Sequence, residues 1–65
     1  MNAIREAREQ RNMSMDELAR AAGVTKASIC RYEKGKRMPR ISIVYKMAKA
    51  LGVPWYTLID TQKAG

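Results

Sequence analysis

The chain has 65 residues, enough for one small domain, and contains no run of the ~20 apolar residues that a membrane-spanning helix needs. A single cysteine, Cys30, excludes an internal disulfide, and without histidine the chain has no convincing ligand set for a metal or cofactor. The six acidic residues are scattered, so no acid–base pair or nucleophilic triad can be assembled, and an enzyme is not expected.

The net charge of +7 is confined to one part of the chain. Acidic and basic residues cancel in residues 1–25 and again in residues 50–65. Residues 26–49 contain a single acid, Glu33, and eight basic residues: Lys26, Arg31, Lys34, Lys36, Arg37, Arg40, Lys46 and Lys49. A surface charged only for solubility would mix the two signs along the chain. The segregation therefore favours a polyanionic partner.

The first two helices are indicated by helix formers and by a capping signal between them. Residues 2–11 favour a helix, and Asn12, which tolerates the left-handed conformation, is expected to end it. Ser14, followed three residues later by Glu17, is a capping box. The second helix should therefore run from Met15 to residue 21 or 22.

A third helix and a basic loop follow. Thr25 is a good N-cap for a helix through about Glu33, and Gly35 is expected to end it. Residues 34–40 form a loop, because Pro39 disfavours a helix at the residue before it. Gly35 and Pro39 interrupt the basic segment, so no single amphipathic helix gathers the charge, and binding to a membrane surface is not expected.

The fourth and fifth helices are short and amphipathic. Gly52 is expected to end the fourth helix, whose apolar stripe follows the spacing i, i+3, i+4, i+7, i+10. The stripe consists of Ile41, Val44, Tyr45, Ala48 and Leu51. Pro54 suits the first turn of a last helix from Trp55 to about Asp60, and residues 60–65 form a tail that we expect to fray. No segment alternates as a strand would, so the predicted fold class is all-α with five helices.

The second and third helices, with a short turn at Gly23, have the arrangement of a helix-turn-helix unit, whose second helix can enter the major groove of DNA. Further residue types match in register across the chain: Ile4, Arg8, Met13, Ser14, Glu17, Leu18, Ala19, Val24, Ile29, Glu33, Gly35, Pro39, Leu51, Gly52, Leu58 and Ile59. At these positions the chain resembles the phage-repressor/Cro-type helix-turn-helix family, the XRE-type transcriptional regulators, over about residues 4–59.

The resemblance implies a repressor-like DNA-binding domain of five helices that occupies residues 1–65 as a single domain. It implies that Arg8 pairs with Glu33 and ties the first helix to the end of the third. It also implies that Ala19 and Gly23 must stay small, so that the second and third helices can cross closely.

By resemblance, four residues of the third helix face base edges in DNA: Lys26, Ala27, Ser28 and Arg31. Lysine and arginine can donate to guanine O6 and N7, a serine hydroxyl can donate or accept, and a small alanine can meet a thymine methyl. For Lys26 and Arg31 a contact to phosphate stays an alternative.

The loop after the third helix is the expected phosphate clamp, formed by Lys34, Lys36, Arg37 and Arg40. The start of the second helix adds backbone N–H groups at Met15, where the family often has a glutamine whose side-chain bond is lost here. Arg40 stands where the family often has a capping serine or aspartate. Ser42 is therefore the candidate cap for a later start of the fourth helix.

These assignments predict a sequence-specific transcriptional regulator that binds double-stranded DNA, a repressor that covers a pseudo-palindromic operator as a homodimer. The alternative is an antitoxin or a DNA-tethering subunit that acts mainly through a protein partner or co-regulator. Trp55 and Tyr56 either complete the small core or form a dimer surface with Leu58 and Ile59.

The expected location is the cytoplasm, in association with the nucleoid, in a prokaryote or phage system. The N-terminus is charged from residue 5 onward and lacks the apolar core of a signal peptide. A single cysteine also suits a reducing compartment.

Overall fold

The computed structural model describes residues 3–63, with side chains described through residue 59. Within these residues all regular structure is helical, which confirms the all-α prediction: α1 (Ala3–Gln10), α2 (Met15–Ala22), α3 (Lys26–Glu33), α4 (Ile41–Leu51) and α5 (Trp55–Lys63). Asn2, the first residue of the predicted first helix, lies outside the described residues. None of the helices in this part of the chain has the length and apolar character needed to cross a membrane.

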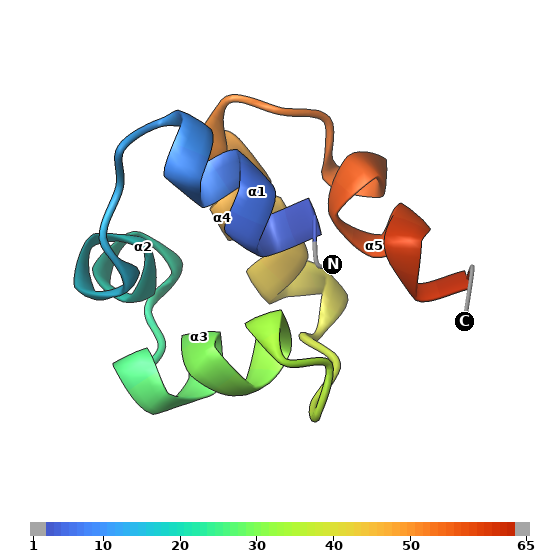
Figure 1. Ribbon diagram of the computed structural model, residues 1–65, viewed down its shortest axis with the longest axis horizontal. Helices are drawn as coiled ribbons and strands as arrows, with labels where there is room; N and C mark the ends of the chain where they lie inside the picture. Colours follow the sequence, from blue (N-terminus) through green and yellow to red (C-terminus); the bar gives the residue numbers. More distant parts are fainter. Residues whose placement is uncertain (1–2, 64–65) are drawn as a thin grey trace.

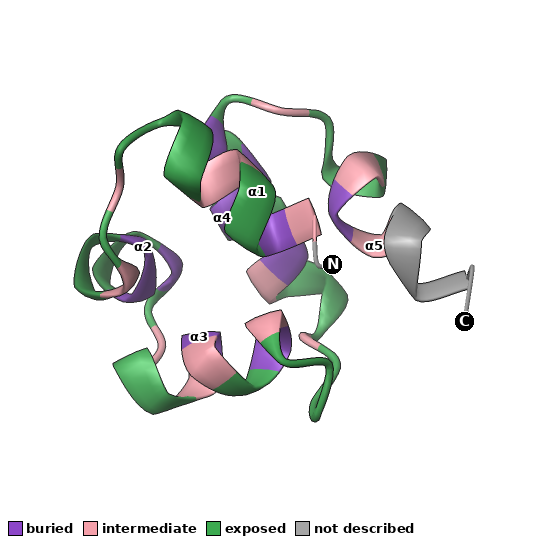
Figure 2. Cartoon of the chain, viewed as in Figure 1, coloured by how far each residue is buried: buried purple, intermediate pink, exposed green. Residues whose placement is uncertain are grey.

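The helices surround one small core (Figure 1). α4 lies behind α1 at the centre of the view, with α2 on the left, α3 along the lower edge and α5 on the right. α2 packs against α3 and α4, α4 packs against α5, and α1 contacts both α3 and α5. All five helices contribute buried residues to this core, coloured purple in Figure 2: Ile4, Leu18, Ala19, Ala22, Ile29, Tyr32, Val44, Met47, Ala48, Leu51 and Leu58.

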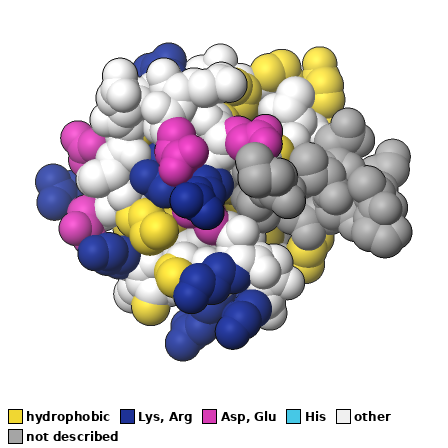
Figure 3. Space-filling view, viewed as in Figure 1, with side chains coloured by type: hydrophobic (Ala, Val, Ile, Leu, Met, Phe, Trp, Pro, Cys, Tyr) yellow, Lys and Arg dark blue, Asp and Glu magenta, His cyan; other side chains and the backbone are white. Residues whose placement is uncertain are grey.

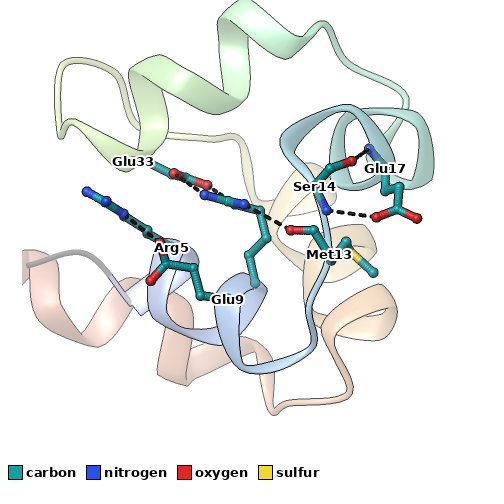
Figure 4. Close-up of polar contacts among 7 residues, drawn as sticks. Arg5, Glu9, Met13, Ser14, Glu17 and Glu33 are labelled. Atoms are coloured by element: carbon teal, nitrogen blue, oxygen red, sulfur yellow. Dashed lines mark hydrogen bonds and ion pairs between the residues drawn. The ribbon is translucent and has the colours of Figure 1, made fainter.

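The ends of the first helices follow the local signals in the sequence. Asn12 has a φ of 54°, and the N–H of Met13 donates to the carbonyl of Arg8 at 3.0 Å, which closes α1 with a left-handed residue. The capping box of α2 is complete (Figure 4). Ser14 Oγ accepts from the N–H of Glu17 at 3.0 Å, and Glu17 Oε1 accepts from the N–H of Ser14 at 2.7 Å.

Gly23 forms the turn between α2 and α3, and its backbone conformation favours glycine there, not the close helix crossing that we expected. Its φ is 71°, a left-handed conformation that strains residues with a Cβ. A Cβ added at Gly23 would meet no atom within 4 Å, so the expectation that Gly23 must stay small for a close crossing is wrong. Ala19, 5% exposed, does belong to the core. Backbone conformation, not space, therefore favours glycine at this turn.

The prediction for α4 was wrong in two details. Ile41 and Tyr45 are 52% and 51% exposed, while Met47 is fully buried, because the buried face of α4 is centred on Val44, Met47, Ala48 and Leu51. The helix also begins at Ile41, directly after Arg40, which caps it without a side-chain hydrogen bond. Ser42 therefore does not delay the start of α4.

α5 extends to Lys63, beyond the predicted end at Asp60, so residues 61–63 are helical and not a frayed tail; residues 64 and 65 of the expected tail lie outside the described residues. Leu58 is 1% exposed and belongs to the core, whereas Trp55 and Tyr56 are 38% and 57% exposed. Leu58 is consequently not available as a contact for a second protomer, and the expectation that it takes part in a dimer surface is wrong. Ile59 is half-buried and packs against the core.

Candidate nucleic-acid interface

One side of α3 packs against the core, and the opposite side is exposed at the edge of the molecule. Ile29 and Tyr32 are buried, whereas Ala27 and Arg31, one helical turn apart, are both exposed. Lys34, three residues after Arg31 and also exposed, continues this row into the loop. The outer side of α3 is therefore a short stripe of one small and two basic residues.

The other two candidate base-contacting residues lie in the first turn of α3. Lys26 is exposed and Ser28 is half-buried. Thr25 caps the helix, since its Oγ1 accepts from the N–H of Ser28 at 3.1 Å. A second bond, from the Thr25 hydroxyl to Ser28 Oγ at 3.0 Å, was not anticipated from the sequence. Two hydroxyl residues three apart at a helix start are the signal that could have found it.

Arg8 joins three segments of the fold through its guanidinium group. Its Nε donates to Glu33 Oε2 at 2.7 Å and its Nη2 donates to Glu33 Oε1 at 3.1 Å, a two-pronged contact from α1 to the end of α3 (Figure 4). Its Nη1 donates to the carbonyl of Met13 at 2.9 Å, in the segment that leads into α2. The Arg8–Glu33 pair expected from the resemblance is thus present. The additional bond to Met13, which no sequence pattern indicates, connects Arg8 to the start of the helix-turn-helix unit.

The pair is shielded from solvent, with 11% of the Arg8 side chain and 4% of the Glu33 side chain exposed. The hydrogen bonds to Glu33 raise the pKa of Arg8 above its ordinary value, against a smaller opposing effect of burial. Since arginine ordinarily titrates above about pH 12, the stabilisation by the pair is fully present at neutral pH. The contribution of the raised Arg8 pKa is lost as the pH rises through the still higher folded-state pKa.

The loop between α3 and α4 gathers basic side chains next to the exposed stripe of α3. All four residues of the expected phosphate clamp are exposed: Lys34, Lys36, Arg37 and Arg40. Lys and Arg side chains gather at the lower edge of the space-filling view (Figure 3), where Figure 1 places α3 and this loop. No ion pair within the described part of the chain neutralises the four, and Glu33 is turned toward Arg8. The loop therefore presents its positive charge uncompensated.

Met15 is the first residue of α2 and is half-buried against the core. Its backbone N–H lies at the helix N-terminus, where no acceptor exists within the helix. The exposed carboxylate of Asp16 lies beside it in the chain, so a phosphate at this end would meet both a donor and a negative charge. Met15 is thus the weakest member of the expected phosphate-contacting set.

A second exposed feature lies on α4 and α5. The ring of Trp55 contacts the ring of Tyr45 edge to face, with centroids 5.6 Å apart. It contacts the ring of Tyr56 in the same geometry, with centroids 5.9 Å apart. We call these three residues the aromatic face. Tyr45 belongs to the apolar stripe expected for α4, and only its exposure reveals that it is part of this surface.

Cys30 is half-buried and makes no disulfide. Among the described residues no three potential metal ligands of the His, Cys, Asp or Glu type lie close enough together to hold an ion.

The family signature described as helix-turn-helix matches residues 4–58 of this chain. The chain belongs to the helix-turn-helix family. The match includes α2, the turn at Gly23 and α3, together with the Arg8–Glu33 pair that holds α3 in place. Membership of this family of transcriptional regulators confirms the resemblance, and with it the expectation that the chain is not an enzyme.

Two curated relatives of this helix-turn-helix chain are transcriptional repressors. The cryptic phage CTXphi transcriptional repressor RstR of Vibrio cholerae is 39% identical over 57 residues, which cover 88% of this chain and 51% of RstR. The HTH-type transcriptional repressor RghR of Bacillus subtilis (strain 168) is 40% identical over 63 residues, covering 95% of this chain and 45% of RghR. The chain therefore spans about half the length of these two relatives.

Solved structures share the fold. A SinR protein/SinI protein complex contains a chain with a TM-score of 0.81 and 31% identity, and the match covers 95% of this chain and 63% of that one. An HTH_3 family transcriptional regulator from Vibrio cholerae has a TM-score of 0.76 and 27% identity, over 91% of this chain and 33% of that one. The five-helix arrangement is thus that of known helix-turn-helix proteins.

The buried ion pair generates a stability prediction. Replacing Glu33 with glutamine leaves the Arg8 charge buried without its partner, so we expect a loss of about 3–5 kcal/mol in the free energy of unfolding. Urea denaturation followed by circular dichroism measures it. The control is Glu9→Gln, which breaks the ion pair between Arg5 and Glu9, whose side chains are 60% and 55% exposed, and which should cost about 1 kcal/mol or less. Equal losses in the two variants would contradict the prediction.

Proposed function

We propose that this chain is a sequence-specific transcriptional regulator that inserts α3 into the major groove of double-stranded DNA. The observation that carries the proposal is the continuous row formed by Ala27, Arg31 and Lys34, exposed on α3 and its loop. The Arg8–Glu33 pair holds the rear of the same helix against α1. An α-helix fits the major groove of B-DNA, and a helix fixed from behind can present its side chains in one orientation.

Base contacts and phosphate contacts are expected from different residues. Lys26, Ala27, Ser28 and Arg31 lie on α3 and are the candidates for contacts to base edges, with Arg31 suited to donate to guanine O6 and N7. Lys34, Lys36, Arg37 and Arg40 lie in the loop, with the backbone of Met15 as a further contact. Neutralising phosphates releases counterions, so the loop supplies affinity that is independent of sequence and sensitive to salt.

The proposed mechanism is repression by a homodimer that occupies a pseudo-palindromic operator. Two copies of α3 would enter successive major grooves about 34–36 Å apart, and the bound dimer would exclude other proteins from that stretch of DNA. The aromatic face supports a contact between protomers, because Trp55 and Tyr56 are exposed aromatic residues in edge-to-face contact with each other. Ile59 lies on the same helix and is partly accessible.

A second candidate function uses the same surface for a different partner. The SinR protein/SinI protein complex shows one protein of this fold in a complex with another. In this chain the aromatic face would then bind a second protein, and the chain would act as an antitoxin or a DNA-tethering subunit. Either regulator would act where the chromosome lies, which in a prokaryote or phage system is the cytoplasm.

The first test is an in vitro selection from random duplexes at near-physiological salt, which should enrich one two-fold symmetric motif.

On that operator, Arg31→Ala should cost about 1–3 kcal/mol of binding free energy and relax the base preference at one or two positions. The matched control, Lys36→Ala, should weaken all duplexes alike and reduce the salt dependence by about one charge. Binding without any enriched motif would contradict sequence-specific recognition. An equal loss on every sequence for Arg31→Ala would place Arg31 on phosphate.

The aromatic face generates a prediction about cooperativity. Tyr56→Glu places a charge on the proposed contact, so the second protomer should no longer bind a two-half-site operator cooperatively, while affinity for a single half-site stays unchanged. Quantitative gel shifts on the two duplexes measure both quantities. Ala21→Glu is the control, because it adds the same charge at an exposed position of α2, on the opposite side of the molecule from α5 (Figure 1). Retained cooperativity in Tyr56→Glu would exclude the aromatic face as the dimer contact.

A further inference from the structure

The aromatic face lies in a part of the chain that carries no negative charge. Residues 34–59 contain no aspartate or glutamate. On α4, Lys49 lies one helical turn after Tyr45, so the two side chains share one side of the helix, and Lys46 follows Tyr45 directly in the chain. Both lysines are exposed, and neither forms an ion pair with another residue in the described part of the chain. Three aromatic rings and two positive charges are therefore close together on α4 and the start of α5.

The rings of this face contact one another and are still accessible. Trp55 lies between the two tyrosines and contacts each of them edge to face. More than half of Tyr45 and of Tyr56 is nevertheless exposed. A planar group that stacks on these rings would cover apolar surface that water now contacts, which is favourable.

We propose that the aromatic face, together with Lys46 and Lys49, binds single-stranded nucleic acid, with bases stacked on the exposed rings and the lysines on phosphates. Aromatic rings that stack on bases, combined with basic side chains that follow the backbone, are the means by which proteins bind single strands without a sequence preference. In a duplex the face of each base is covered by its neighbours, so double-stranded DNA cannot use these rings. The inference goes beyond the proposed function and does not depend on a contact between α3 and duplex DNA.

A second copy of the chain complements this face less well than a single strand does. In a two-fold symmetric contact the same patch meets itself, so the lysines of both copies approach one interface, and residues 34–59 supply no acid to pair with them. A single strand carries a phosphate for every base and therefore matches both the charge and the rings. The two occupants exclude each other, so a bound single strand should oppose the cooperative contact between protomers proposed above.

The test uses the fluorescence of Trp55, which is the one tryptophan of the chain and belongs to this face. The purified chain is titrated at near-physiological salt with a short oligothymidylate and, separately, with a short oligouridylate, neither of which pairs with itself. Saturable quenching is expected, because a base stacked on the face changes the surroundings of the indole. Quenching by oligothymidylate alone would identify single-stranded DNA as the ligand, and quenching by oligouridylate alone would identify RNA; either result supports the inference.

Three variants show whether the strand lies on this face. Tyr56→Ala removes one stacking ring and should weaken oligonucleotide binding about five-fold or more, whereas the matched control Tyr56→Phe keeps the ring and should bind as the wild-type chain does. Lys49→Gln should weaken binding and lower the slope of its salt dependence by about 0.7. None of the three should alter the affinity for a random-sequence duplex, which Lys36→Ala in the basic loop weakens instead.

The absence of quenching by both oligonucleotides would overturn the inference. In that case, a Trp55 signal that changes with protein concentration would assign the face to a second copy, and a signal that does not would assign it to a different protein. Equal oligonucleotide affinities of Tyr56→Ala and Tyr56→Phe would also overturn the inference, because binding would then not involve stacking on this ring. The motif enriched from random duplexes is measured independently, so the inference and the proposed function can fail separately.

Discussion

The guanidinium of Arg8 holds the end of α3, and the position of the proposed recognition helix depends on this contact. Two bonds to Glu33 fix α3 against α1, and a third to the carbonyl of Met13 fixes the segment that enters α2. A buried ion pair is in general weak evidence for stability, because desolvation offsets much of the attraction. Its planar, two-pronged geometry nevertheless specifies one arrangement of the helices, which an apolar contact of the same size would not do.

The same contact affects the charge that the surface presents. Glu33 is the one acid within residues 26–49, and it is 4% exposed and committed to Arg8, which comes from the electrically balanced part of the chain. The positive charge of α3 and its loop is therefore not reduced by a neighbouring carboxylate. One interaction thus positions the helix and removes the single negative charge that would oppose a polyanion on the same side of the molecule.

Much of the fold was predictable from the sequence because its helix boundaries are marked by local chemistry. Asn12, the Ser14–Glu17 box, Thr25 and Gly52 act within a few residues of the chain, and the structure shows each at a helix end. The errors at Tyr45 and Met47 concern properties that depend on tertiary packing. Periodicity could not show that Tyr45 turns outward to meet Trp55 while Met47 fills the core, because both positions are compatible with an apolar stripe.

Part of the candidate site was also predictable from the sequence, whereas individual side-chain bonds within it were not. The Arg8–Glu33 pair was expected only through the resemblance, since no local pattern joins residues 25 positions apart. The bond from Arg8 to Met13 and the donation from Thr25 to Ser28 depend on the geometry of particular atoms. Composition predicted a polyanionic partner from the placement of the basic residues, and the structure places six of the eight on α3 and the loop that follows it: Lys26, Arg31, Lys34, Lys36, Arg37 and Arg40.

The central claim is that α3 and the basic loop form the surface that contacts DNA, and amide shifts in a ¹⁵N–¹H NMR titration with duplex DNA test it most directly. With a duplex carrying one half-site, we expect the largest shifts in residues 26–37 and at the start of α2, with the aromatic face of α4 and α5 little changed. The largest shifts on α4 and α5, with α3 unaffected, would contradict the account.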